Sequence, residues 1–280
     1  MSLVIIWAYY GTEGNVMDLG LKGRVAIVGG SSKGMGRATA IALAKEGALV
    51  AISSRTESDL RKVEMEISRL ASQQHVLAIP GDLSEPDQIR KVVRDTFNRF
   101  ERIDIVINNL GGPPPGKPSE IEDPAWEQAL KQNFLSAVRM SREVIPYMKL
   151  QRWGRIVNLL SNAVRQPVLD LVLSTSSRLA VVGFAKMLSN ELAPFNITVN
   201  NALPGSVMTD RMTSLYKKMA EARGEAIDTL ITEATKKIPM QRLGQPEEMA
   251  DLITFLSSER ASFITGQSIS LDGGALASTL

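Results

Sequence analysis

Short apolar segments alternate with helical patterns along most of this chain. Seven segments rich in aliphatic residues predict strands, at residues 25–28, 49–53, 76–79, 103–107, 155–160, 198–202 and 268–271. Their positions are nearly all apolar instead of alternating between apolar and polar. Strands of this kind, joined by helices, are typical of a parallel sheet that is covered on both faces. The pattern therefore predicts an α/β fold with a doubly wound, seven-stranded parallel sheet.

One segment departs from this alternation. Residues 208–240, between the sixth and seventh predicted strands, show a helical pattern and are rich in Met. Unbranched Met side chains suit an adaptable apolar pocket, but they are at least as common in plain packing. We expect a helical substrate lid at about residues 208–240, within a single domain that spans residues 17–280.

Residues 1–16 precede that domain and include an apolar patch at residues 4–10. The patch lacks a basic leader and is too short to cross a bilayer. We interpret residues 1–16 as an N-terminal extension, either a frayed tail or, less favoured, a tail that packs on a neighbouring subunit. Met17 is an alternative start.

Composition excludes several classes of function. The chain has 280 residues, 32 basic and 30 acidic residues with a formal charge of +2, and no cysteine. The near balance of charge favours neither nucleic acid nor an anionic membrane as a partner. The absence of cysteine excludes disulfides and thiolate chemistry. We expect a cytoplasmic protein with a small-molecule partner and no metal site.

The most informative motif follows the first predicted strand. There the sequence reads GGSSKGMG and continues into a helical pattern. Gly30, Gly34 and Gly36 allow a tight turn and a close approach of the backbone to a ligand. The free N–H groups and the positive end of the following helix then face an anion. The order of strand, glycine turn and helix predicts a dinucleotide phosphate site, although an ordinary loop is the alternative.

Further motifs follow in a fixed order. They are GDL at residues 81–83, NNLGG at 108–112, Asn133, IVNLLS ending at Ser161, PGSVMT at 204–209, and TGQSISLDGG at 265–274. Together with the glycine loop, they resemble the short-chain dehydrogenase/reductase family, a single-domain Rossmann family, and most closely its 3-oxoacyl-acyl-carrier-protein reductase-like branch. The resemblance implies an oxidoreductase that binds a nicotinamide dinucleotide.

The resemblance also implies which residues hold the cofactor. It places Gly30, Gly34 and Gly36 at the phosphates, Asp82 and Leu83 beside the adenine, and Val207 and Thr209 at the nicotinamide amide. The full set of expected cofactor residues is Gly30, Ser32, Lys33, Gly34, Met35, Gly36, Ser54, Arg55, Asp82, Leu83, Asn108, Arg178, Pro204, Gly205, Val207 and Thr209. The proline-rich segment 108–118 is expected to form one wall of the pocket.

Charge at the end of the second strand indicates which cofactor is used. Proteins that read the unphosphorylated ribose usually place a carboxylate there. In this chain the position holds Ser54, followed by Arg55, and Lys33 lies in the glycine loop. Two cations near a 2′-phosphate would form charge-assisted hydrogen bonds with it. We therefore expect NADP(H) to be preferred over NAD(H), the alternative being that both cations are solvated surface charges.

The catalytic segment departs from the family pattern. The family usually places a Tyr 13 residues after the active-site Ser and a Lys four residues further on. Counted from Ser161, these positions hold Ser174 and Arg178, whereas Asn133 and Ser161 remain. A phenol has a pKa near 10 and an alkyl hydroxyl one closer to the roughly 15.7 of water, a difference on the order of 7 kcal/mol. Ser174 is also shorter than Tyr, so a bound water is expected to complete the proton path.

Other candidates for the missing acid are weaker. His75 is the only histidine and lies at the start of the third predicted strand. Asp170 precedes Ser174, and Tyr216 belongs to the predicted lid. None of them outranks a bound water. Arg178 keeps a positive charge but is a poor proton donor, because its pKa exceeds about 12.

Two functions remain open from the sequence. The first is an NADP(H)-dependent oxidoreductase that transfers a hydride between nicotinamide and a carbonyl or alcohol substrate, with Ser161, Asn133, Ser174 and Arg178 as catalytic residues. Its atypical proton path runs through Ser161, Ser174 and water. The second is a dinucleotide-binding protein with little or no turnover, acting as a sensor or a structural subunit. The resemblance further implies a homotetramer.

Overall fold

The computed structural model describes residues 17–71, 75–109 and 111–278, so the predicted extension at residues 1–16 lies outside the described residues. Seven parallel strands form one sheet in the order β3-β2-β1-β4-β5-β6-β7, which confirms the predicted fold class. The strands are β1 (Val25–Gly29), β2 (Leu49–Ser53), β3 (Val76–Ala78), β4 (Ile105–Asn108), β5 (Gly154–Leu159), β6 (Ile197–Pro204) and β7 (Ser268–Leu271). Strand β6 continues two residues beyond its predicted end, to Pro204, because β7 pairs with it up to Leu271.

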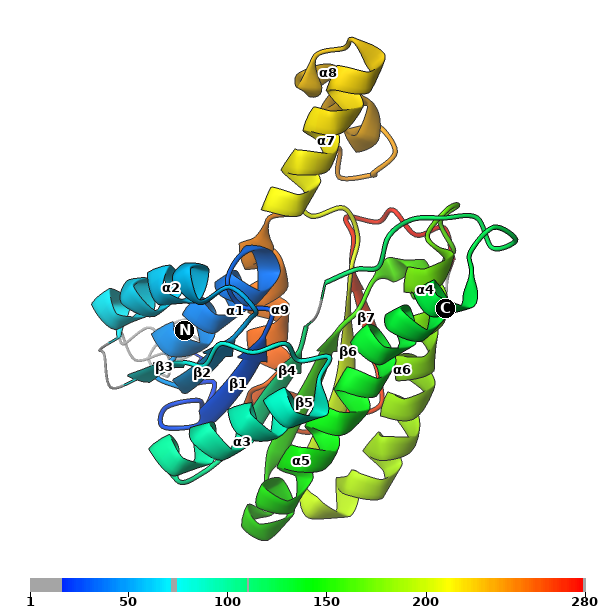
Figure 1. Ribbon diagram of the computed structural model, residues 1–280. Helices are drawn as coiled ribbons and strands as arrows, with labels where there is room; N and C mark the ends of the chain where they lie inside the picture. The colour runs from blue at the N-terminus through cyan, green and yellow to red at the C-terminus, as the bar shows by residue number, and fades with distance from the viewer. Residues whose placement is uncertain (1–16, 72–74, 110, 279–280) are drawn as a thin grey trace, which may run out of the picture.

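Helices cover both faces of the sheet (Figure 1). Those on one face are α1 (Gly34–Lys45), α2 (Glu57–Leu70) and α9 (Pro246–Leu256), and those on the other are α3 (Pro86–Phe100), α5 (Ser136–Gln151) and α6 (Val172–Leu192). A short helix, α4 (Asp123–Ala129), continues through a π-helical turn, Leu130–Leu135, into α5. None of the helices in the described ranges is both long and apolar enough to cross a membrane.

Two apolar cores lie on opposite sides of the sheet. Leu43 of α1, Leu60 of α2 and Ile253 of α9 are fully buried in one core. Ile89 of α3 and Val144 of α5 are fully buried in the other. Alternate residues of each strand supply both cores, which explains why the strand sequences are apolar at nearly every position.

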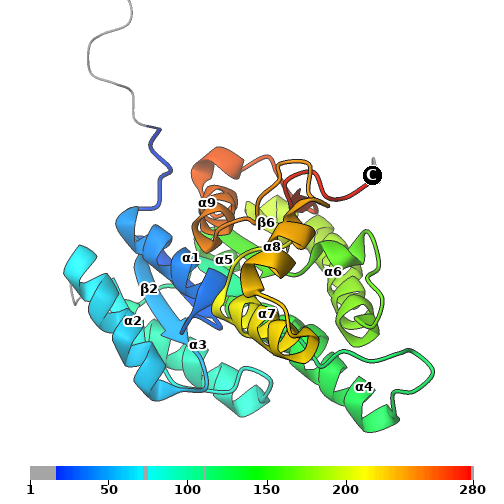
Figure 2. The ribbon, with the colours of Figure 1, turned by 90° about the horizontal axis from the view of Figure 1, so that it is seen from above.

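Helices α7 (Asp210–Arg223) and α8 (Ile227–Thr235) stand above the carboxyl edge of the sheet (Figures 1 and 2). They occupy the segment predicted to form a lid. Tyr216, Leu230 and Leu243 form a separate small core there, and Met212 and Met219 pack against it. Met208, Met212 and Met219 therefore serve packing within the segment, which was the plainer of the two predicted roles, whereas Met240 is exposed.

Side-chain amides on three strands and a hydroxyl on a fourth form a row of hydrogen bonds across the sheet. The side chain of Asn108 donates to Asn158 at 2.8 Å, Asn158 donates to Asn201 at 2.9 Å, and Asn201 donates to Ser268 at 2.9 Å. These residues are also partners in the strand register. The amide ladder therefore pairs polar groups that would otherwise be unsatisfied inside the sheet.

The Asn158→Ala variant should unfold more easily than the native chain. It removes the acceptor of Asn108 and the donor to Asn201, at about 1–3 kcal/mol for each buried group left unsatisfied. Urea denaturation measures the free energy of unfolding. The matched control is Asn190→Ala on the exposed face of α6, and equal losses in the two variants would contradict a structural role for the ladder.

Candidate active site

A cavity of about 480 Å³ opens at the carboxyl ends of the central strands. Its walls come from the glycine loop after β1, the end of β2, the loops that follow β3 and β4, and the start of α7. The sheet order reverses between β1 and β4. In open α/β sheets this reversal is where ligands bind.

The glycine loop is held in place from the neighbouring strand. Asn109, directly after β4, donates from its side-chain nitrogen to the carbonyl oxygens of Gly29 at 3.1 Å and Gly30 at 3.3 Å. Gly30 has a φ of +56°, and a Cβ there would lie 2.6 Å from the carbonyl oxygen of Asn109. A Cβ on Gly36 would collide with the carbonyl oxygen of Gly30. Gly30 and Gly36 therefore allow a turn that only glycine fits.

This loop fits the phosphates of a dinucleotide. Helix α1 begins at Gly34 and no side chain caps its first N–H groups, so they are available to an anion. Lys33 and Arg55 are exposed, line the same cavity, and have no hydrogen bond or ion pair with any residue in the described ranges. The hydroxyl of Ser54, also on the cavity, is buried without a hydrogen-bond partner in the described structure. Positive charge and unused hydrogen-bonding groups thus meet at the end of β2.

Arg178 marks the opposite end of the cavity. It lies on α6, is 8% exposed, and donates a hydrogen bond to the hydroxyl of Ser174 one turn earlier. Burial, and then the nearby guanidinium of Arg211, lower the pKa of Arg178 to about 10. Its guanidinium therefore remains charged at neutral pH.

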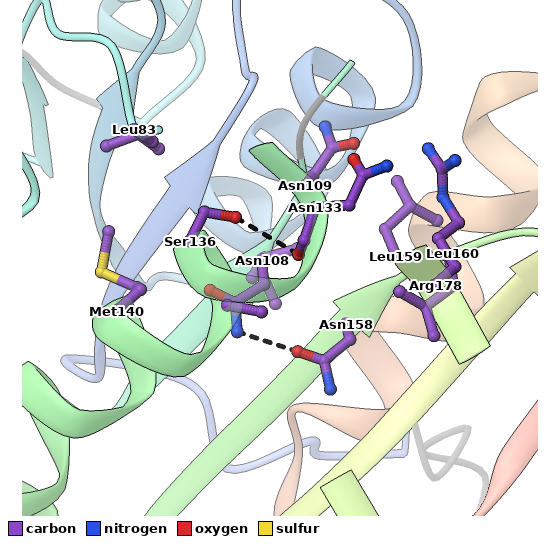
Figure 3. A pocket seen from close by; sticks show the side chains of 12 residues that line it. Leu83, Asn108, Asn109, Asn133, Ser136, Met140, Asn158, Leu159, Leu160 and Arg178 are labelled. Carbon is purple, nitrogen blue, oxygen red and sulfur yellow. Dashed lines mark hydrogen bonds between the residues drawn. The ribbon is translucent and has the colours of Figure 1, made fainter. Parts of the chain in front are cut away.

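A second cavity, of about 30 Å³, adjoins Arg178 (Figure 3). Asn108, Asn133 and Asn158 contribute to its walls. A polar cavity of this size can hold a water molecule. Asn133 belongs to the π-helical turn, where its side-chain nitrogen donates to the hydroxyl of Ser177 at 2.8 Å.

Not all four predicted catalytic residues come together in these cavities. Asn133 and Arg178 line the small cavity, and Ser174 is bonded to Arg178. Ser161 follows β5 and accepts a hydrogen bond from the backbone N–H of Ala163 at 3.2 Å. Neither Ser161 nor Ser174 is among the residues that line the two cavities.

Most of the predicted cofactor residues share the large cavity. Those on its walls are Gly30, Ser32, Lys33, Gly34, Met35, Gly36, Ser54, Arg55, Asp82, Leu83, Arg178 and Thr209. Asn108 lies instead on the small cavity and in the amide ladder. Pro204 ends β6, Gly205 donates to the carbonyl of Leu271 at 2.9 Å, and Val207 pairs with Gly244. These last three carry the chain from β6 toward α7.

The alternative acids are poorly placed. Tyr216 is 5% exposed and lies in the small core of α7 and α8, where burial raises the pKa of its phenol. Asp170 is exposed in the loop before α6, and His75 directly precedes β3. In the described part of the chain, no group of three or more His, Cys, Asp or Glu residues could hold a metal ion.

Two residues of the site were missed from the sequence. Asn109 was part of the NNLGG motif, but its role depends on a contact with the glycine loop about 80 residues earlier. Arg211 lines the cavity from α7. The sequence signal that could have found it is its position two residues after the PGSVMT motif, which ends at Thr209.

Comparison with known proteins agrees with this architecture. Residues 30–275 match the family model described as enoyl-(acyl carrier protein) reductase. A putative ketoacyl reductase of the monensin polyketide synthase from Streptomyces virginiae is 36% identical over 90% of this chain and 96% of the relative. The 3-oxoacyl-[acyl-carrier-protein] reductase of Aquifex aeolicus is 32% identical over 92% of this chain and 99% of the relative.

The fold is also similar to solved structures. L-sorbose reductase from Gluconobacter frateurii, complexed with NADPH and L-sorbose, has a TM-score of 0.90 and 29% identity, over 94% of this chain and 100% of that one. The chain therefore belongs to the short-chain dehydrogenase/reductase family of oxidoreductases, and it is similar to the 3-oxoacyl-[acyl-carrier-protein] reductases within it.

The Gly36→Ala variant tests the close packing of the glycine loop. Its added methyl group meets the carbonyl of Gly30, so the loop must shift, and we expect the free energy of unfolding to fall by about 1–3 kcal/mol. The control is Gly81→Ala, whose methyl group would first meet the side-chain end of Gln88 at 3.3 Å. Similar urea midpoints for the two variants would contradict the constraint.

Proposed function

We propose that this protein is an NADPH-dependent reductase that transfers a hydride between nicotinamide and a carbonyl or alcohol substrate. The observation that carries this proposal is that one cavity is lined by the glycine loop, by the exposed cations Lys33 and Arg55, and by the buried guanidinium of Arg178. Membership of an oxidoreductase family and the NADPH found in the similar L-sorbose reductase support it. The related reductases further favour a 3-oxoacyl-type substrate.

In this proposal each region of the cavity binds one part of the cofactor. The N–H groups that follow Gly30, Gly34 and Gly36 hold the pyrophosphate. Lys33 and Arg55, with the free hydroxyl of Ser54, hold the 2′-phosphate. The adenine lies beside Asp82 and Leu83, while Pro204, Gly205, Val207 and Thr209 surround the nicotinamide.

When bound, the nicotinamide supplies or accepts the hydride. Arg178 hydrogen-bonds the ribose hydroxyls and contributes positive charge, but it does not release a proton at neutral pH. Because Arg178 donates to the oxygen of Ser174, the hydroxyl hydrogen of Ser174 stays free to donate elsewhere. Ser174 is proposed to position a water that protonates the substrate oxygen, while Ser161 hydrogen-bonds that oxygen. Asn133 adjoins the water-sized cavity that links this path to Arg178.

The assembly and location are also proposals. We infer a homotetramer formed through the helices around Asn133 and Ser174 and the segment near Ser268. The outer face of α6, where Leu179 is 45% and Met187 is 70% exposed, supports it. A cytoplasmic location stays a prediction.

A second candidate function rests on Ser174 and Arg178. Replacement of both the usual phenol and the usual ammonium favours a protein that binds the dinucleotide with little or no turnover. Such a protein acts as a sensor of redox state or as a structural subunit. If the protein oxidises NADPH with any member of a panel of diketones, oxoacyl thioesters, sugars and steroids, the reductase function is supported and this second function is contradicted.

Titration with NADPH and NADH tests the proposed cofactor. We expect NADPH to bind at least about tenfold more tightly, because charge-assisted hydrogen bonds to the 2′-phosphate are worth about 1.5–3 kcal/mol. The Arg55→Ala variant should lose most of this preference without a change in NADH affinity. Arg69→Ala, which removes an exposed charge from the far end of α2, is the control. A preference for NADH in the native chain would contradict the proposal.

Restoring the usual residue pair tests the atypical proton path. The double variant Ser174→Tyr with Arg178→Lys should raise the rate of NADPH oxidation with an activated ketone, because a phenol is a far stronger acid than an alkyl hydroxyl. Thermal unfolding and NADPH affinity serve as controls. An unchanged rate in a folded, NADPH-binding variant would show that these two positions do not limit proton transfer.

A further inference from the structure

Arg211 occupies a distinct place above the cavity. It is the second residue of α7, is exposed, and lines the cavity from the lid side. Its guanidinium lies against Gly112 in the loop after β4, since a Cβ on Gly112 would be 2.5 Å from Nη1 and 3.2 Å from Cζ. The side chain therefore extends from the lid segment to the opposite wall of the cavity.

The guanidinium of Arg211 has no counter-ion among the residues that the structure describes. Within the described ranges, Arg211 makes no hydrogen bond or ion pair, and the hydrogen bond of Arg178 goes to the neutral hydroxyl of Ser174. Asp210 also lines the cavity, but no ion pair joins its carboxylate to either arginine. The other acid on the wall, Asp82, accepts a hydrogen bond from the backbone N–H of Ser84.

Two like charges therefore face one cavity, and neither forms an ion pair with a residue that the structure describes. Arg211 acts on Arg178 as a neighbouring cation. An anion bound beside Arg211 would relieve the repulsion between the two guanidinium groups. The paired N–H groups of a planar guanidinium match the two oxygens of a carboxylate. Because the glycine loop and the cations at the end of β2 already provide for the phosphates of a dinucleotide, Arg211 is available to the substrate.

We propose that Arg211 binds a carboxylate of the substrate, so that the substrate is an oxo acid instead of a neutral ketone. A 3-oxoacyl substrate would then bind as the free acid and not as a thioester, which has no carboxylate. This proposal rests on the proposed reductase function. The lid arginine would hold the carboxylate while the carbonyl lies toward Arg178 and Ser174. Arg211 is then a specificity-determining residue. Its loss lowers the affinity for oxo acids and leaves the affinity for neutral ketones unchanged.

Isothermal titration of the NADPH-saturated protein tests this role without requiring turnover. The probes are 2-oxopentanoate, 3-oxopentanoate and 4-oxopentanoate, each paired with its methyl ester. We expect at least one acid to bind about tenfold or more tightly than its ester, as for a charge-assisted hydrogen bond. The Arg211→Ala variant should lose that difference, with ester binding unchanged. Lys217→Ala, an exposed charge on the same helix outside the cavity lining, should retain it.

The NADPH affinity of each variant separates the other outcomes. Equal binding of every acid and its ester to the NADPH-loaded native protein would overturn the carboxylate site alone. A loss of NADPH affinity in Arg211→Ala equal to its loss of acid affinity would also overturn it, by assigning the guanidinium to the cofactor phosphates. Failure of the native protein to bind NADPH would instead contradict the reductase function itself.

Discussion

The contact between the loops after β1 and β4 is the constraint on which the site depends. The side-chain amide of Asn109 holds two carbonyl oxygens of the glycine loop, and Gly36 approaches the carbonyl of Gly30 too closely for any side chain. This contact sets where α1 begins and therefore where its free N–H groups point. It also joins the two central strands at the point where the order of the sheet reverses. The walls of the large cavity follow from that geometry.

The positive charges along the cavity differ in their exposure to solvent. Lys33 and Arg55 are exposed at one end, where they pair with no residue of the described ranges and solvent weakens their field. Arg178 is buried at the other end, where the same charge acts more strongly on its surroundings. A guanidinium at this buried position keeps its charge under conditions in which a buried ammonium would lose it. An arginine at this position therefore favours electrostatic stabilisation over proton transfer.

The sheet and the glycine loop could be predicted because each has a local signal. Apolar runs of strand length indicate strands covered on both faces, and glycine spacing directly after a strand indicates a tight turn. Twelve of the proposed cofactor positions do share one cavity. The roles of these residues as cofactor ligands stay predictions.

Other features depend on contacts between distant segments and had no local signal. Asn108 stays a predicted cofactor residue, and the pairing of its amide with Asn158 across the sheet had no signal in the sequence. Its neighbour Asn109, directly after β4, instead reaches the glycine loop that follows β1. Likewise, the burial of Tyr216 follows from the way α7 packs on the segment after it, which periodicity alone does not reveal.

The segment of α7 and α8 stabilises itself. Its apolar residues pack on one another and on Ala275 instead of joining the cores beneath the sheet. A substitution there consequently perturbs little of the packing that holds the nucleotide-binding half together. Substitutions in this segment can thus change the surface above the cavity while the sheet and the glycine loop stay intact, which is one physical route by which a single fold acquires many substrates.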